Sequence, residues 1–287
     1  MSCAACGADA MRLAFRVAGE PGDFAPTTDR FGVALGDFER CGECGHLQLV
    51  SMPDVARLYE EAESEAYEVE EEGQRATARD ALGRIERHLA SRGRLLDYGC
   101  WVGFLASEAD RRGWVVTGLE PSRWAAERAR SRGVDVVEDP EGPFDAIAMG
   151  DVIEHLPDPG AALERMASLL GPRGVLWIAT PDAGSRVARL LGPRWWSVIP
   201  THVHLFTRRS LTRLLERHGF ELLAIRRSPK TFSVAYYLDR ASGYSPALGR
   251  ALVRIARLAG VADRQWTPDF RDRFEVVARP AQAPPPR

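Results

Sequence analysis

Short apolar runs alternate with amphipathic helical patterns along the chain from Arg94 onward. Strands that alternate with helices in this way form a parallel sheet covered on both faces. The pattern therefore predicts a doubly wound, Rossmann-like α/β domain with a seven-stranded sheet. The predicted strands are GRLLDYG, WVVTGLEPS, VDVVED, FDAIAMGD, GVLWIATP, FELLAIRRS and FEVVARP, and the predicted helices are FLASEADRRG, SRWAAERARSRG, ALERMASLL and SLTRLLERHGF.

The segments around this sheet predict further units. Residues 53–92 are acidic and mostly helical in pattern, so we expect a helical linker or lid before the domain at 93–279. Residues 234–262 separate the last two strands as a helical insertion. Its apolar face can pack on the domain, cover a substrate or touch an acidic membrane surface. The tail 280–287, PAQAPPPR, is predicted to be disordered.

Four of the five cysteines form two C-x-x-C pairs, Cys3 with Cys6 and Cys41 with Cys44, separated by 34 residues. Two such pairs are typical of a tetrahedral zinc site with four thiolate ligands. Strand-like stretches between the pairs predict a zinc ribbon over residues 1–52. Disulfides are the alternative, and a reducing cytosol would disfavour them. Because four thiolates complete the coordination, we expect the zinc to be structural.

Composition and charge add little to the fold but bear on partners. The chain has 287 residues, of which 45% are hydrophobic and 27% charged, as in ordinary globular proteins. The net charge of −2 gives no argument for a nucleic-acid partner. Residues 181–287 nevertheless carry 19 basic and 8 acidic side chains, and arginine forks bind phosphate or carboxylate well.

The chain contains no apolar run near the roughly 18 residues that span a bilayer. Its first residues lack the apolar core of a signal peptide. We therefore expect a cytoplasmic protein without stable membrane insertion. The sequence gives no prediction of the oligomeric state.

The turn after the first predicted strand predicts a nucleoside site. The dinucleotide motif G-x-G-x-x-G fails here, because Trp101 and Phe104 stand where its second and third glycines would be. The turn instead has Asp97 just before Gly99, with Gly103 four residues further on. Glu120 ends the next strand, where a carboxylate can accept both hydroxyls of a ribose. These features suit a nucleoside without a pyrophosphate.

Five stretches together resemble a known family: LLDYGCWVGFLA, GLEPS, FDAIAMGDVIEHLPDP, GVLWIATP and HVHLFTRRSLTRLLERHGFELL. They are similar to class I S-adenosylmethionine-dependent methyltransferases, and most similar to the branch with an N-terminal four-cysteine zinc ribbon. The resemblance implies S-adenosylmethionine as the cofactor. It implies a first motif around the methionine part of the cofactor, a carboxylate on the ribose, a contact near adenine, a stretch beneath the sulfonium and a tyrosine closing over the methionine. The implied binding residues are, in chain order, Tyr59 or Tyr67, Asp97, Gly99, Cys100, Trp101, Gly103, Glu120, Pro121, Asp139, Met149, Gly150 and Asp151.

Trp101 departs from the family, which typically has glycine at this position. A positive φ would make tryptophan costly there. With an ordinary φ, the indole can line the methionine pocket, and its face can attract a sulfonium cation. The alternative is a fold that has lost its cofactor, with the ribbon acting as a scaffold or nucleic-acid adaptor.

Methyl transfer to a hydroxyl needs a base, and histidine is the usual choice near neutral pH. His155 follows the fourth strand, and His202 and His204 lie together in PTHVHLF, so these three are the catalytic candidates. Asp151-x-x-Glu154-His155 also resembles the stretch that holds a divalent ion in ubiquinone-pathway O-methyltransferases. A metal there and a purely structural role are the alternatives.

The resemblance also suggests the acceptor. Its zinc-ribbon branch is associated with sugar, polysaccharide and natural-product pathways, so we expect a hydroxyl of a sugar, glycan or secondary metabolite. The basic C-terminal third would suit a phosphorylated or nucleotide-linked acceptor. Sugar C-methyltransferases with similar cysteines are a second possibility, although they carry a large C-terminal domain that this chain lacks. Trp195 and Trp196 either stack on such an acceptor or fill a core.

Overall fold

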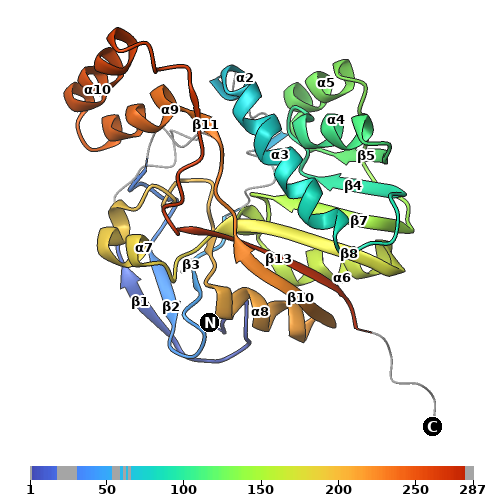
Figure 1. The fold of residues 1–287 in the computed structure, drawn as a ribbon. Coiled ribbons are helices and arrows are strands. Elements are labelled where there is room, and N and C mark those ends of the chain that lie inside the picture. The colour runs from blue at the N-terminus through green and yellow to red at the C-terminus, as the bar shows by residue number, and fades with distance from the viewer. Residues whose placement is uncertain (1, 18–30, 54–58, 61–62, 64–65, 282–287) are drawn as a thin grey trace.

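The computed structural model covers the whole chain, and the structure describes residues 2–17, 31–53, 59–60, 63 and 66–281. The predicted tail at 280–287 lies outside the described residues, apart from its first two positions. A seven-stranded sheet forms the centre of the molecule, and helices cover both of its faces (Figure 1).

The strand order of this sheet is β10-β13-β8-β7-β4-β5-β6. Neighbouring strands from β8 to β6 run parallel, whereas β13 runs antiparallel to both β8 and β10. The structure thus confirms the predicted Rossmann-like sheet. The strands are β4 (Arg94–Tyr98), β5 (Val115–Leu119), β6 (Asp135–Val137), β7 (Phe144–Gly150), β8 (Leu170–Pro181), β10 (Phe220–Arg227) and β13 (Arg273–Pro280).

Two apolar layers hold the helices to the sheet. Successive residues of β7 alternate between them, because side chains along a strand point to opposite faces. Ala146 and Ala148 pack with helices α3 (Glu71–Glu86) and α4 (Phe104–Arg111). Ile147 and Met149 pack with α6 (Pro159–Leu169) and α8 (Arg208–Arg217). Helix α5 (Arg123–Ser131) packs beside α4.

The N-terminal segment forms a second, antiparallel sheet in the order β1-β2-β3-β9 (Figure 1). Its first three strands are β1 (Met11–Phe15), β2 (Phe38–Cys41) and β3 (Leu47–Leu49). The fourth, β9 (His204–Leu205), comes from the segment after β8. The N-terminal segment is therefore completed by a strand that lies some 150 residues further along the chain.

The segment between β10 and β13 contains α9 (Val234–Asp239) and α10 (Pro246–Leu258), with a short hairpin of β11 (Phe232–Ser233) and β12 (Gln265–Trp266). Helix α10 exposes Ile255 and Leu258, at 62% and 80% of their surface. None of the helices in the described parts of the chain is long and apolar enough to cross a membrane. The remaining short helices are α2 (Ala66–Val69), η1 (Ile153–His155), α7 (Arg186–Leu191), η2 (Gly192–Arg194) and η3 (Arg240–Gly243).

Candidate active site

A cavity of about 1020 Å³ opens at the carboxyl ends of the parallel strands. Ligands of open α/β sheets bind at this edge. Gly99 follows β4, Glu120 follows β5, Gly150 ends β7 and Asp151 follows it. All four residues line the cavity. The opposite wall comes from Tyr59 and from segments 196–202, 229–240 and 268–273. The cavity is large enough for a nucleoside cofactor together with a small acceptor.

The glycine turn has the close backbone approach that the sequence predicts. Gly99 has φ +75°, and a Cβ there would lie 2.6 Å from Val152 Cγ2. The N–H groups of Gly99 and Cys100 both donate to the Leu119 carbonyl, at 2.8 and 3.0 Å. The turn is thereby fixed to the end of β5, and a side chain at position 99 would displace it.

Trp101 adopts the positive φ, +48°, that is costly for a tryptophan. Its backbone N–H donates to Glu120 Oε2 at 2.8 Å, and its ring lies 5.8 Å from that of Trp124. Trp101 is among the residues that line the cavity of about 1020 Å³. Trp101 therefore shapes one wall of the cavity.

Two carboxyl groups contact this turn and the helix after it, the buried Asp97 and the half-buried Glu120. Glu120 accepts backbone N–H groups of Ser122 and Trp101, and burial raises its pKa to about 7. Asp97 accepts the N–H of Ala106 at 3.1 Å, and burial likewise raises its pKa to about 7. Each Glu120 oxygen retains a lone pair for a further donor, so the side chain can accept ligand hydroxyls.

His155 also lines the cavity. Its Nδ1 is 2.9 Å from the Thr201 carbonyl oxygen and 2.5 Å from the Tyr59 hydroxyl. A carbonyl only accepts, so the bond to Thr201 places the proton on Nδ1 and leaves the lone pair on Nε2. Burial lowers the pKa of His155 to about 4, which keeps the ring neutral. The His202 ring packs edge-on against it, with centroids 4.6 Å apart.

Asp151 forms an ion cluster with Lys230 and Arg273 on the cavity wall. Lys230 Nζ lies 2.5 Å from Asp151 Oδ2, and Arg273 pairs with the other oxygen. Burial opposes ionisation of Asp151, but Arg273 and Lys230 together hold its pKa well below the usual range.

This ion cluster corrects the predicted metal set of Asp151, Glu154 and His155. Two cations already neutralise Asp151, so these three residues do not fit a divalent ion. Among the described residues, the ligand atoms that come within 4.8 Å of one another there belong to Glu154, His155 and His202. Burial raises the pKa of Glu154 to about 8, so this carboxyl group is largely neutral at pH 7.

Aromatic side chains, here called the aromatic wall, form another part of the cavity lining. Phe232 stacks on Tyr236 with ring centroids 4.2 Å apart, and Trp196 packs edge-on against Phe270 at 5.8 Å. Tyr237 lies between these pairs. Arg240 also lines the cavity, with its guanidinium over the Tyr236 ring and no carboxylate within 4.0 Å among the described residues.

The structure thus brings most of the predicted site residues together. The members that line the main cavity or the small recess beside it are Tyr59, Asp97, Gly99, Cys100, Trp101, Glu120, Pro121, Gly150, Asp151, His155 and His202. Cys100 and Asp97 reach only the recess, where Cys100 is 5% exposed. The side chain of Tyr67 lies outside the described residues.

Four predicted site residues lie away from the cavity. Met149 is fully buried in the core under the sheet. Gly103 begins α4, where a Cβ would crowd the Ala129 backbone at 3.1 Å. Asp139 is 83% exposed and pairs with Arg165. His204 is buried against His46 of the N-terminal sheet, at 3.0 Å. We leave these four out of the proposed site.

Lys230, Arg273, Thr201 and, apart from Trp196, the aromatic wall were not predicted from the sequence. The sequence did contain a signal for Lys230, because it is the only lysine in the chain. Arg273 is one of many arginines, and Thr201 acts through its backbone carbonyl, which no side-chain pattern reveals. The tyrosines of α9 belong to an insertion whose position over the cavity depends on tertiary packing.

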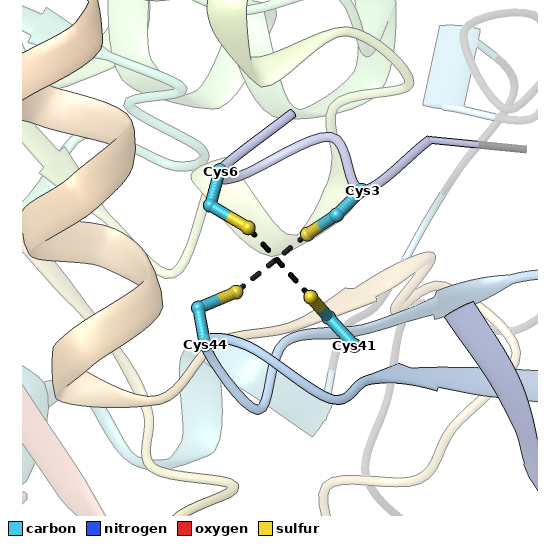
Figure 2. A group of neighbouring side chains, drawn as sticks. All are labelled: Cys3, Cys6, Cys41 and Cys44. Carbon is cyan, nitrogen blue, oxygen red and sulfur yellow. Dashed lines mark hydrogen bonds between the residues drawn. The ribbon is translucent and has the colours of Figure 1, made fainter. Parts of the chain in front are cut away.

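The four paired cysteines converge at one point, as Figure 2 shows. Their sulfur atoms lie 3.6 Å apart for Cys3 with Cys44 and for Cys6 with Cys41. A zinc ion with four bonds of about 2.3 Å requires sulfur–sulfur distances of roughly 3.8 Å. The arrangement fits a tetrahedral thiolate site, and Cys100 lies apart from it in the glycine turn.

Comparison with known proteins identifies the family. A family model described as "Methyltransferase domain" matches residues 70–225, more than half of the chain. The chain belongs to this family of methyltransferase domains.

Relatives and solved structures agree with this assignment. A ubiquinone biosynthesis O-methyltransferase of Caulobacter vibrioides is 36% identical over 119 residues, which cover 35% of this chain and 47% of that protein. A ubiquinone biosynthesis O-methyltransferase of Rhodopseudomonas palustris strain HaA2 is 31% identical over 160 residues, which cover 49% of this chain and 62% of that protein. The chain thus spans about half the length of the curated relatives it matches.

Two solved structures resemble this fold. One is a complex between the Haloferax volcanii Trm112 methyltransferase activator and a putative methyltransferase, at TM-score 0.53 and 15% identity over 75% of this chain and 92% of that one. The other is magnesium protoporphyrin IX methyltransferase from Synechocystis, at TM-score 0.50 and 14% identity over 77% and 90%. At these identities the likeness concerns the fold.

The Glu120 geometry predicts a pH-dependent cofactor affinity. The carboxylate is charged above its pKa of about 7 and protonated below it, and the charged form is the stronger acceptor for hydroxyl groups. We expect affinity for S-adenosylmethionine, measured by isothermal titration, to fall several-fold from pH 8 to pH 6. Glu120→Gln should bind about tenfold more weakly at pH 8 and lose this dependence. Glu127→Gln, a change at an exposed residue of the cavity rim, should behave as the wild type.

Proposed function

We propose that this methyltransferase transfers the methyl group of S-adenosylmethionine to a hydroxyl of a small-molecule acceptor, a sugar, glycan or secondary metabolite. The observation that carries the proposal is that one cavity is lined by the glycine turn, Glu120, His155 and the aromatic wall together. O-methyltransferase is also the activity in the names of the relatives at 36% and 31% identity.

The cofactor end would be built from the first two strand ends. Gly99 leaves room for the methionine part, Glu120 would accept the ribose hydroxyls, and Trp101 would cover the pocket. When bound, the sulfonium supplies the electrophilic methyl group. The protein then has to hold nucleophile and methyl group in line and exclude water. The presence of a cavity of about 1020 Å³ beside Trp101 supports cofactor binding over the alternative of a degenerate fold.

His155 would act as the general base. Its neutral ring, held through Nδ1 by the Thr201 carbonyl, would take the acceptor's hydroxyl proton on Nε2. The Tyr59 hydroxyl lies against the same Nδ1 atom, and Tyr59 would close the cavity over the cofactor. Lys230 and Arg273 add positive charge nearby, which would stabilise the developing oxyanion of the acceptor.

The acceptor would lie against the aromatic wall. Flat apolar faces stack on aromatic rings, whether they belong to a sugar or to an aromatic ring system. Arg240 offers a guanidinium at this wall that no described carboxylate neutralises. A carboxylate or phosphate on the acceptor would match it, which supports the hypothesis of a phosphorylated or nucleotide-linked acceptor.

We also propose that the four cysteines hold one structural zinc ion. The convergence of four buried or half-buried sulfur atoms supports it. The zinc would have no open coordination position, so it would stabilise the fold and take no part in methyl transfer.

Replacing His155 tests the proposed base. We expect His155→Ala to lower kcat by about 10²- to 10⁴-fold, the usual contribution of a general base. Its affinity for S-adenosylmethionine should stay near the wild-type value, because Glu120 and the glycine turn are unchanged. Methylated product is measured by mass spectrometry over a panel of sugars and phenolic metabolites. His218→Ala, at the C-cap of α8, is the matched control. Wild-type turnover by His155→Ala would contradict the role.

The position of Arg240 at the aromatic wall predicts a preference for acceptors that carry a negative charge. Arg240→Gln should raise KM at least tenfold for an acceptor that carries a phosphate or carboxylate, and leave KM for its neutral analogue unchanged. Arg254→Gln, an exposed arginine on α10, should have no effect on either. If KM changed equally for both acceptors, Arg240 would support the aromatic wall and would not recognise the charge of the acceptor.

The zinc proposal predicts one zinc ion per chain by elemental analysis. Cys44→Ser should lose the metal and lower Tm by on the order of 10 °C, since a structural zinc contributes folding free energy. Cys100→Ser removes a buried thiol outside the cluster and should retain the zinc. A metal-free wild-type protein with unchanged Tm would refute the assignment.

A further inference from the structure

The N-terminal sheet is joined to the segment that carries the candidate catalytic histidines. We call residues 197–207 the histidine segment. Strand β3 pairs with β9 of this segment, so that Leu47 lies opposite Leu205 and Gln48 opposite His204. The Leu49 N–H donates to the Val203 carbonyl at 3.1 Å. One edge of the histidine segment is therefore a strand of the cysteine-bearing sheet.

The contacts between side chains reinforce this pairing. His46 Nε2 lies 3.0 Å from His204 Nδ1, and both rings are fully buried. Gln48, 2% exposed, accepts the Ala4 N–H at 2.9 Å and so reaches the first cysteine pair. Thr207 Oγ1 donates to the Cys44 carbonyl at 2.9 Å. The second cysteine pair is thus bonded directly to the histidine segment, and the first is bonded to β3, which pairs with it.

The other side of the same segment faces the cavity. The Thr201 carbonyl holds His155 Nδ1, and the His202 ring packs against that of His155. His202 Nδ1 bonds the Ser197 carbonyl at 2.8 Å, and the Val203 N–H donates to the Glu154 carbonyl at 3.0 Å. The segment therefore lies between the cysteine cluster and the candidate base, with hydrogen bonds on both sides.

From this chain of contacts we infer that the cysteine cluster sets the position and tautomer of His155, with His46 and His204 as positioning residues. The clustered sulfurs hold β3, β3 holds β9, and the segment before β9 presents the Thr201 carbonyl to His155. The metal would thereby influence methyl transfer from outside the cavity, although it touches neither cofactor nor acceptor. A misplacement of about 1 Å at a reacting group can cost on the order of 100-fold in rate.

The inference deepens the proposed function, since it gives the N-terminal sheet a role for the same base. The inference can be tested by an experiment that needs no acceptor. Metal is removed from the folded wild-type protein with a chelator, its release is followed with a zinc indicator, and backbone hydrogen exchange is measured by mass spectrometry. We expect exchange in residues 197–207 to rise at least tenfold, and exchange in α4 and affinity for S-adenosylmethionine to stay unchanged.

Two results would overturn the inference. Unchanged exchange at 197–207 after metal release would show that the segment is held without the cluster. A uniform rise across all strands would show that the metal supports the fold as a whole. Absence of methyl transfer by the wild-type protein would instead count against the proposed function, and it would leave the exchange result intact.

Substitutions at His204 separate positioning from mere stability. His204→Asn keeps a polar atom where Nδ1 lies, and His204→Leu removes it. We expect ¹⁵N NMR of the His155 ring to report the Nδ1-protonated tautomer in the wild type and in His204→Asn, and a mixture in His204→Leu. Once an acceptor has been identified, we expect His204→Leu to lower kcat about 10- to 100-fold. Its KM for the cofactor should not change.

The matched control is Arg217→Ala, which removes a different contact between the N-terminal segment and α8, a bond to the Ala5 carbonyl at 3.1 Å. It should lower Tm without changing the His155 tautomer or kcat. Equal losses of kcat in Arg217→Ala and His204→Leu, in proportion to Tm, would assign His204 a structural role only and overturn the inference.

Discussion

The hydrogen bond between the Trp101 N–H and the Glu120 carboxylate joins the first two strand ends, and the cofactor end of the cavity depends on it. A tryptophan at positive φ costs of order 1–3 kcal/mol, and the turn keeps it only because its surroundings fix that conformation. Glu120 provides one such restraint, and the two N–H bonds to the Leu119 carbonyl provide another. The same carboxylate that would bind a ribose thus also holds the turn in the shape that admits a ligand.

A related constraint governs the acceptor end, where charged and polar groups are buried. Asp151 is stable as an anion there because Lys230 and Arg273 compensate it, whereas Glu154 has no hydrogen-bond partner for its carboxyl oxygens among the described residues and its pKa rises. His155 and His202 stay neutral for the same reason, since burial lowers the pKa of each. The charges of the site are therefore confined to one compact ion cluster. The imidazole rings of His155 and His202 beside it are uncharged, and only an uncharged ring can accept a proton.

Sequence reasoning identified local features well and tertiary ones poorly. The sheet, its helices, Asp97, Gly99 and Glu120 follow from periodicity and turn chemistry over short stretches, because parallel strands place their carboxyl ends at one edge. Met149 shows the limit: it lies one residue before the end of β7, yet the alternation of this strand turns its side chain into the core. Asp139 and His204 sit at plausible sequence positions, but Arg165 and His46 hold them elsewhere. Such partners lie 26 and 158 residues away, beyond the reach of any local pattern.

The position of the cysteine-bearing sheet follows from the same consideration. A four-stranded sheet this small buries too little apolar surface to be stable alone, and its inner residues Phe38, Leu47 and Leu49 share a core with Trp195 and Val198 of the segment after β8. The cysteines themselves pack into the core beneath the main sheet. A module appended for binding another molecule would keep its own core and its own edge strand. Here both are shared with the segment that carries His202, so the N-terminal sheet is part of the catalytic domain's structure.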